Sequence, residues 1–143
     1  MLRGMNESDI ELVASKMKID QTEAKNLIEQ WNTHFVNGHF FEMLAVLDGD
    51  SVVGMISLYE HSKSIISFGP EIFEEYRRNG FGKTAMIEAI GRAKEKKYSI
   101  ILQQVRTDNI ASIRLHESLG FEKDNSIYKN RKGNDIFLYL KTL

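Results

Sequence analysis

The stretch "RRNGFGKTA" at residues 77–85 combines two arginines and two glycines with the start of an apolar helical pattern. Glycines let a ligand approach the backbone closely, and the unpaired N–H groups of a first helical turn attract anions. The stretch therefore predicts a site for a diphosphate. Such glycine-rich loops also occur as solvated turns with no ligand. Evidence from the rest of the chain is needed to choose between a binding loop and a turn.

Two familiar phosphate-binding loops do not fit. The P-loop pattern G-x-x-x-x-G-K-[ST] needs glycine at position 77, where this chain has Arg77. The dinucleotide pattern G-x-G-x-x-[GA] is formally met at 80–85, but it must directly follow a buried strand. Here "EEYRRN" (74–79) intervenes after a strand that is expected to end near Phe73. The loop must act in another structural setting.

Strand and helix patterns alternate around the loop. "SIISFGPEIF" (64–73) predicts a strand in which Gly69-Pro70 breaks the pairing on one side, since proline cannot donate to a ladder. A helix with apolar residues between 85 and 93 follows, then a strand at 99–105 and a short helix at 109–119. This order favours parallel strands in the middle of the chain.

The two ends of the chain favour hairpins and amphipathic helices. Two helices are expected first, capped by the pairs Ser8/Glu11 and Asp20/Glu23, with the second apolar stripe extending to Phe35. Hairpins are expected at 40–59 around Gly49 and at 121–140, the latter from "FEKDNSIY" and "DIFLYL". The fold class is therefore α/β, with a mixed sheet covered by helices on both faces.

Composition limits the partners. The 143 residues fit one domain spanning 1–143, and 19 basic against 20 acidic side chains leave a net charge of −1. No global field draws this chain to nucleic acid or to a membrane, so a small-molecule or peptide partner is expected. The chain has no cysteine and no apolar stretch of signal-peptide or membrane-spanning length, which predicts a cytoplasmic location.

Two linked segments resemble the GNAT superfamily of acetyl-coenzyme A dependent N-acyltransferases. They are "EEYRRNGFGKTAM" (74–86) and "QQVRTDNIASIRLHESLGFEK" (103–123), which match the family's [RQ]-x-x-G-x-[GA] motif, its asparagine and its closing leucine-glycine-phenylalanine. The resemblance covers nearly the whole chain. It implies a GNAT-type central sheet whose two parallel strands splay apart to admit acetyl-coenzyme A.

The resemblance also assigns coenzyme-binding residues. It places backbone groups of Ile72 on the pantetheine arm and the thioester carbonyl, and it places Asn109 on the same arm. Asn109 has the spacing of a helix cap as well, and the two roles are compatible. The diphosphate would lie on the loop that begins at Arg77 and continues through Arg78, Asn79, Gly80, Phe81, Gly82 and Lys83.

The sequence offers one candidate for the catalytic acid and none for the base at the family's usual positions. Many family members carry a tyrosine as proton donor where this chain has His116; imidazole can donate, but a packed histidine is an equal alternative. The family's usual base positions hold Ile66 and Gln104, so no base is carried over. Water is the preferred proton acceptor over three other candidates, which are Glu60, His61 and Glu71. No metal site is expected, because the start of H-E-x-x-H at His116 fails at Gly120.

The predicted function is transfer of an acetyl group from acetyl-coenzyme A, as co-substrate, to a primary amine of a small molecule or a protein amino terminus. The resemblance implies direct attack in a ternary complex, and family members often form homodimers. Two alternatives stay open: a non-catalytic coenzyme A binding module, and a nucleic-acid-binding domain that uses Arg77, Arg78, Arg92, Lys94, Lys96 and Lys97.

Overall fold

The computed structural model describes all residues, 1–143. The chain folds into a mixed sheet with helices on both faces. Along the chain, the elements are β1 (Leu2–Gly4), a 3-10 turn (Glu7–Asp9), α1 (Ile10–Met17), α2 (Gln21–Trp31), β2 (Phe35–Val36), β3 (His39–Asp48), β4 (Ser51–Glu60), β5 (Ile65–Ile72), a 3-10 turn (Glu74–Tyr76), α3 (Phe81–Glu95), β6 (Ile100–Arg106), α4 (Ile110–Ser118), β7 (Glu122–Lys123), β8 (Tyr128–Lys129) and β9 (Asp135–Thr142).

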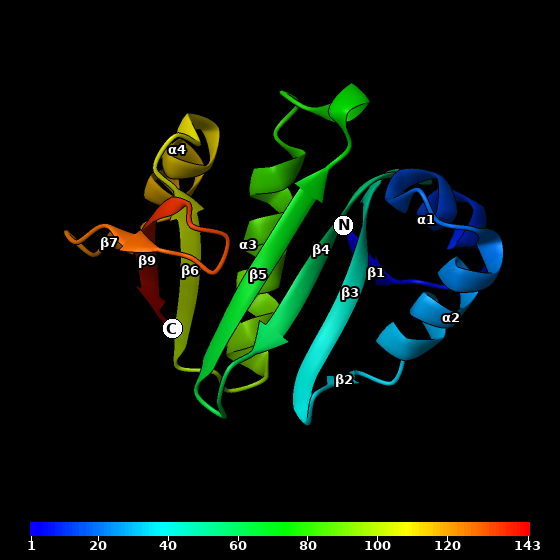
Figure 1. The fold of residues 1–143 in the computed structure, drawn as a ribbon, viewed down its shortest axis with the longest axis horizontal. Coiled ribbons are helices and arrows are strands. Elements are labelled where there is room, and N and C mark those ends of the chain that lie inside the picture. The colour runs from blue at the N-terminus through cyan, green and yellow to red at the C-terminus, as the bar shows by residue number, and fades with distance from the viewer.

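The strands form one sheet in the order β1-β3-β4-β5-β6-β9-β7, with β2 paired to β3 and β8 to β9. All neighbours are antiparallel except β5 and β6, which run in the same direction. The expected α/β fold with a mixed sheet is confirmed. Figure 1 shows β5 and β6 side by side at their start and drawing apart toward their arrowheads.

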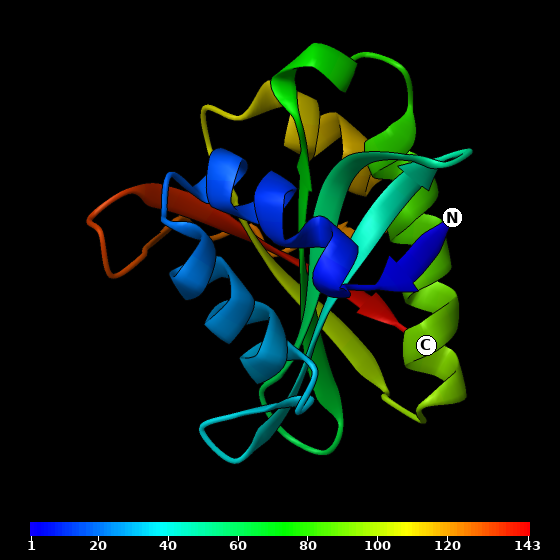
Figure 2. The ribbon, with the colours of Figure 1, turned by 90° about the vertical axis from the view of Figure 1, so that its right-hand side faces the viewer.

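The helices enclose two cores, one on each face of the sheet. Helices α1 and α2 pack on one face through Val13, Ala24, Ile28 and Trp31, and α3 packs on the other face with a larger set of buried residues. Figure 2 shows α1 and α2 on one side of the sheet and α3 on the opposite side. None of the helices combines the length and apolarity needed to cross a bilayer.

Several local expectations are confirmed. The Asp20 side chain caps α2 by accepting from the Glu23 N–H at 2.8 Å. Gly49 has a φ of +57° in the tight turn between β3 and β4, a backbone conformation that suits glycine. In α3, the five predicted apolar residues are all buried: Ala85, Met86, Ala89, Ile90 and Ala93.

Three local expectations are wrong. The first cap is Asn6, not Ser8, because Asn6 and Asp9 form a capping box in a 3-10 turn before α1. Arg3 holds the buried Asp9 carboxylate at 2.8 Å, which fixes that turn. Helix α2 ends at Trp31, so Phe35 lies outside it and is 61% exposed. The single strand expected at 121–128 is divided into β7 and β8, which both pair with β9 but at different parts of it.

Candidate functional site

The parallel pair β5–β6 separates after two residues. Its backbone pairing is limited to Ile65 with Ile100 and Ile66 with Ile101. Meanwhile β5 stays paired to β4 as far as Ile72, and β6 stays paired to β9 as far as Arg106. Pairing is therefore lost on one side of β5 only, as Gly69-Pro70 predicted, although it stops earlier than that dipeptide. The freed edge of β5 faces a cleft.

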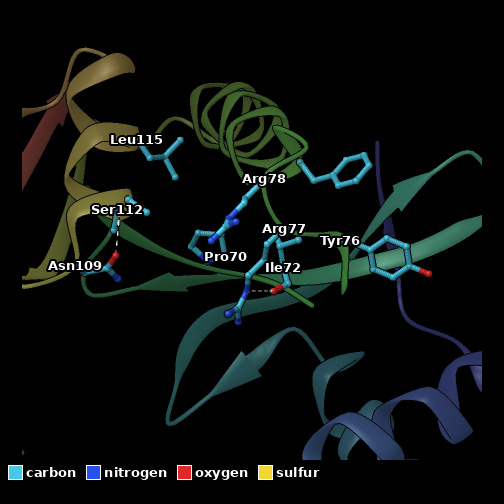
Figure 3. A pocket seen from close by; sticks show the side chains of 11 residues that line it. Pro70, Ile72, Tyr76, Arg77, Arg78, Asn109, Ser112 and Leu115 are labelled. Atoms are coloured by element: carbon cyan, nitrogen blue, oxygen red, sulfur yellow. Dashed lines mark hydrogen bonds between the residues drawn. The ribbon is translucent and has the colours of Figure 1, made fainter. Parts of the chain in front are cut away.

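The cleft has a volume of about 450 Å³ and opens between β5, α4 and the loop into α3. Figure 3 shows Pro70, Ile72 and Arg77 on one side and three residues of the α4 segment on the other. Its lining residues are Pro70, Ile72, Tyr76, Arg77, Arg78, Phe81, Gly82, Asn109, Ala111, Ser112 and Leu115. Apolar and cationic groups thus share one cleft, which suits a ligand with an apolar arm and an anionic group.

The loop at 77–80 is shaped so that the first turn of α3 faces this cleft. Arg78 and Gly80 both have left-handed backbone conformations, with φ values of +67° and +80°. The Asn79 amide donates to the carbonyls of Tyr76 and Arg77 at 3.0 and 3.1 Å and so braces the loop. No side chain caps α3, and its first turn has no acidic residue. The N–H groups there favour an anion.

Six of the residues predicted to bind coenzyme line the cleft together: Ile72, Arg77, Arg78, Phe81, Gly82 and Asn109. Asn79, Gly80 and Lys83 belong to the same loop and helix start but are not among the lining residues. Their assignment stays a prediction that rests on backbone groups. The Arg77 Nε donates to the Ile72 carbonyl at 3.0 Å, as the dashed line in Figure 3 shows. This guanidinium covers one of the backbone groups assigned to the ligand.

Asn109 caps α4, as its spacing suggested, and also lies at the cleft, where the resemblance to the GNAT family placed it. Its side-chain oxygen accepts from the Ser112 N–H at 3.1 Å and so caps α4. The same residue lines the cleft, with Ser112 and Leu115 one and two turns further along α4. Because only the oxygen is used by the cap, the amide nitrogen can donate to a ligand.

His116 does not line the cleft. It is 3% exposed, and its ring packs against Phe121 and Tyr139 with centroid distances of 5.0 and 5.5 Å. Its Nδ1 lies 2.7 Å from the Ser112 carbonyl, and its Nε2 lies 3.3 Å from the Gln103 amide nitrogen. Both ring nitrogens are thus occupied inside the protein. This geometry does not support the acid role, which stays a prediction.

The candidate bases also lie outside the cleft lining. Glu60 accepts from the Tyr98 hydroxyl at 2.8 Å, a bond that lowers the pKa of the Glu60 carboxyl and makes it a weaker base. The His61 Nε2 is 2.6 Å from the Ser67 hydroxyl, and Glu71 is exposed. Water remains the expected proton acceptor. The chain holds no group of three or more His, Asp or Glu side chains that could bind a metal ion.

Sequence reasoning missed two kinds of site residue. Tyr76, Ala111 and Leu115 line the cleft only because α4 and the loop after β5 meet across it. Gln103 is buried at 4% exposure and lies at the point where β5 and β6 part. Its signal was present in the alternation of "IILQQV", which puts Gln103 on the same face as Ile101 and Val105.

Burial makes His116 a source of pH-dependent stability. Burial lowers the pKa of its imidazole below the ordinary value of 6.5. Between that ordinary value and the lower native one, the unfolded chain binds more protons than the native protein. Stability should be complete above about pH 6.5 and should fall as pH drops through that window. The melting temperature of the parent should therefore fall more steeply between pH 7.5 and 5.5 than that of His116→Gln.

The neighbouring titratable groups do not change this expectation. Tyr139 packs on the ring, but burial raises its pKa and keeps it neutral. Glu117, on the same helix, accepts from the Tyr139 hydroxyl at 3.4 Å in a pair that the His116→Gln substitution leaves in place. Equal pH slopes for the parent and the variant would contradict the assignment of a neutral His116.

A sheet that splays at its parallel pair, with an uncapped helix start on the rim of the opening, defines a class of α/β proteins with a cleft inside the sheet. Residues 9–121 match the model of the acetyltransferase (GNAT) family, and the chain belongs to this family of N-acetyltransferases. The chain is 28% identical over 124 residues to YokL, an uncharacterized N-acetyltransferase of the SPbeta prophage in Bacillus subtilis. That match covers 85% of this chain and 70% of YokL.

Solved structures of low sequence identity share the fold over nearly their whole length. A ribosomal-protein-alanine N-acetyltransferase from Brucella melitensis matches with a TM-score of 0.77 at 22% identity, covering 100% of this chain and 99% of its own. The protein YncA of Salmonella typhimurium, solved with its cofactor acetyl-CoA, matches with a TM-score of 0.77 at 16% identity, covering 100% and 93%. These likenesses confirm the GNAT-type sheet.

Proposed function

We propose that this protein transfers the acetyl group of acetyl-coenzyme A to a primary amine of a small molecule or a protein amino terminus, by direct attack in a ternary complex. The observation that carries the proposal is the one-sided loss of pairing on β5, which leaves backbone groups facing a cleft of about 450 Å³. The acetyl-CoA in YncA and the alanine acetylation in the Brucella protein's name support it. The proposal treats 1–143 as one acetyltransferase domain, since both cores pack on one sheet.

The chain's own groups suit the separate parts of coenzyme A. The diphosphate would lie on the N–H groups at the start of α3, where the dipole and the absence of acidic side chains favour negative charge. The pantetheine arm would run along the freed edge of β5 and donate to or accept from its backbone groups near Ile72, with Asn109 opposite. Arg77 would leave the Ile72 carbonyl to make room for the arm.

The transfer itself needs a neutral amine, a polarised thioester and a proton for the departing thiolate. The Ile72 N–H would polarise the thioester carbonyl, since a fixed donor stabilises the oxyanion that develops and Pro70 has no N–H to offer. The cleft lining contains no carboxylate or imidazole, so water would accept the proton of the amine. Water would also protonate the thiolate, because His116 lies outside the cleft lining and its Nδ1 is bonded to the Ser112 carbonyl.

A thiol-release assay with acetyl-coenzyme A over a panel of amines tests this function. The panel should contain polyamines, amino acids, aminoglycosides and peptides with free amino termini. The expected result is thiol release that depends on the amine and saturates with it. Tight coenzyme binding without amine-dependent release from any member of the panel would instead support the non-catalytic binding module.

The arrangement of the cleft predicts which part of coenzyme A provides the affinity. Because the diphosphate and pantetheine would make most of the contacts, adenosine alone should bind at least about 100-fold more weakly than coenzyme A. Calorimetric titration with the two ligands checks this directly. Similar affinities would mean that the adenine, not the diphosphate, is the main anchor.

A further inference from the structure

A buried side chain takes over the pairing of β5 and β6 where their backbones part. Beyond Ile66 the next β5 residue that faces β6 is Phe68, and its backbone groups bind no strand there. Instead the Phe68 N–H donates to the Gln103 Oε1 at 2.7 Å, and the Gln103 Nε2 donates to the Phe68 carbonyl at 2.9 Å. Gln103 thus satisfies both backbone groups of Phe68 while holding the strands a side chain's width apart.

The opposite face of the same strands carries a second tie. The Ser67 hydroxyl donates to the Leu102 carbonyl, again from β5 to β6, and accepts from the His61 Nε2. Because backbone groups alternate in direction along a strand, the next β5 groups to face the cleft are those of Pro70 and Ile72. The two ties therefore lie just before Pro70, the first β5 residue that lines the cleft, on the side where its inner end is.

These bonds fix the orientation of the Gln103 amide. Turning the amide over would set its oxygen against the Phe68 carbonyl and its NH₂ group against the Phe68 N–H, so only one orientation satisfies both groups. In that orientation the second N–H of Gln103 points to the His116 Nε2 at 3.3 Å. The imidazole must accept that bond.

The contact of the other ring nitrogen, Nδ1, indicates the same tautomer of His116. The Ser112 carbonyl can only accept, so the His116 Nδ1 at 2.7 Å carries the proton. With the proton on Nδ1 and a lone pair on Nε2, His116 is a neutral imidazole that connects α4 to Gln103. A protonated ring would place an Nε2–H against the NH₂ group of Gln103 and break the chain of bonds.

We propose that Gln103 sets the splay of β5 and β6 at the inner end of the cleft, and that His116 is a positioning residue that orients Gln103 and not the acid of the reaction. The link to catalysis rests on the proposed acetyl transfer, whereas the clamp of Phe68, Gln103 and His116 is a property of the folded chain. The two can therefore fail separately.

Nitrogen NMR of the native protein tests the clamp without any variant. The imidazole ¹⁵N shifts of His116 at pH 7 are expected to show a protonated Nδ1 and an unprotonated Nε2. The amide of Phe68 is expected to be protected from hydrogen exchange in the parent and to exchange at least about tenfold faster in Gln103→Met, which has similar volume and no hydrogen bonds. An Nε2–H tautomer, or unchanged exchange of Phe68, would overturn the clamp.

Two substitutions of His116 separate positioning from acid catalysis. A glutamine at 116 can accept from Gln103 through its amide oxygen but cannot give a proton to a thiolate. We expect His116→Gln to keep at least about a third of the turnover, whereas loss of a general acid would cost about 100-fold. His116→Leu leaves a Gln103 N–H unsatisfied and is expected to raise the KM for acetyl-coenzyme A about tenfold, with kcat reduced less.

The pattern of kcat, KM and melting temperature decides between the roles. Loss of about 100-fold in kcat for His116→Gln, at parental melting temperature and coenzyme affinity, would establish the acid role and overturn ours. Rescue by glutamine but not by leucine supports positioning. If the protein releases no thiol with any amine, coenzyme A affinity measured by calorimetry takes the place of KM, so the clamp is still tested when the proposed function fails.

Discussion

Replacing Gly82 with glutamate is expected to weaken coenzyme A binding by at least about 100-fold while the fold persists. Gly82 lines the cleft in the first turn of α3, and a Cβ built on it would meet only the Ile72 Cγ1, at an ordinary contact distance of 3.8 Å. The added carboxylate would project into the space assigned to the diphosphate. Its bulk and its like charge both oppose the ligand, and neither disturbs the core.

Gly91→Glu is the matched control, because it makes the same substitution in the same helix with no heavy atom within 4 Å of the new Cβ. It should bind coenzyme A as the parent does. Calorimetry gives both affinities, and thermal melts establish that both variants are folded. Parental affinity in a folded Gly82→Glu protein would show that the diphosphate lies elsewhere.

The second large effect concerns the strand that carries the freed edge. Gly54 pairs with Ile72 across β4 and β5, and a Cβ at Gly54 would lie 2.4 Å from the Glu71 carbonyl oxygen and 2.9 Å from the Ile72 Cα. Backbone atoms at these distances must move, and such overpacking costs about 1–3 kcal/mol. For a domain of this size, Gly54→Ala should lower the melting temperature by about 3–12 °C.

Gly69→Ala is the control for this strain. The new Cβ would meet only the Ser57 Oγ at 2.7 Å, and a hydroxyl on a rotatable bond can turn away. Its melting temperature should stay within about 3 °C of the parent. If Gly54→Ala melted at the parental temperature, β5 would not lie as close to β4 as the structure has it.

The fold was largely predictable because its signals are local. Glycine at 49 and 120, the cap at Asp20 and the apolar face of α3 each specify their element within a few residues. Gly69-Pro70 predicted a one-sided break in pairing, but the break begins after Ile66, so the missing N–H of Pro70 does not by itself set its position. Asn6 was missed in favour of Ser8 because Arg3, across the turn, fixes Asp9 and hence the earlier cap.

The site could be predicted from sequence only where its residues are consecutive in the chain. Residues 77–82 carry their own turn and helix start, so the loop could be located from sequence. The environment of His116 could not, because it depends on which residue of β6 faces Phe68 and on how α4 packs over both. An alternation pattern shows that Gln103 is buried, but it does not show which group satisfies the amide.

The most direct test of the central claim is a crystal structure of the protein with coenzyme A. We expect the pantetheine arm between β5 and β6, beside Pro70 and Ile72 and stopping short of the Phe68–Gln103 bonds, with Arg77 turned away from the Ile72 carbonyl. We expect the diphosphate on the backbone N–H groups of residues 78–83. Coenzyme A bound outside this cleft, or a diphosphate held away from the start of α3, would contradict this claim.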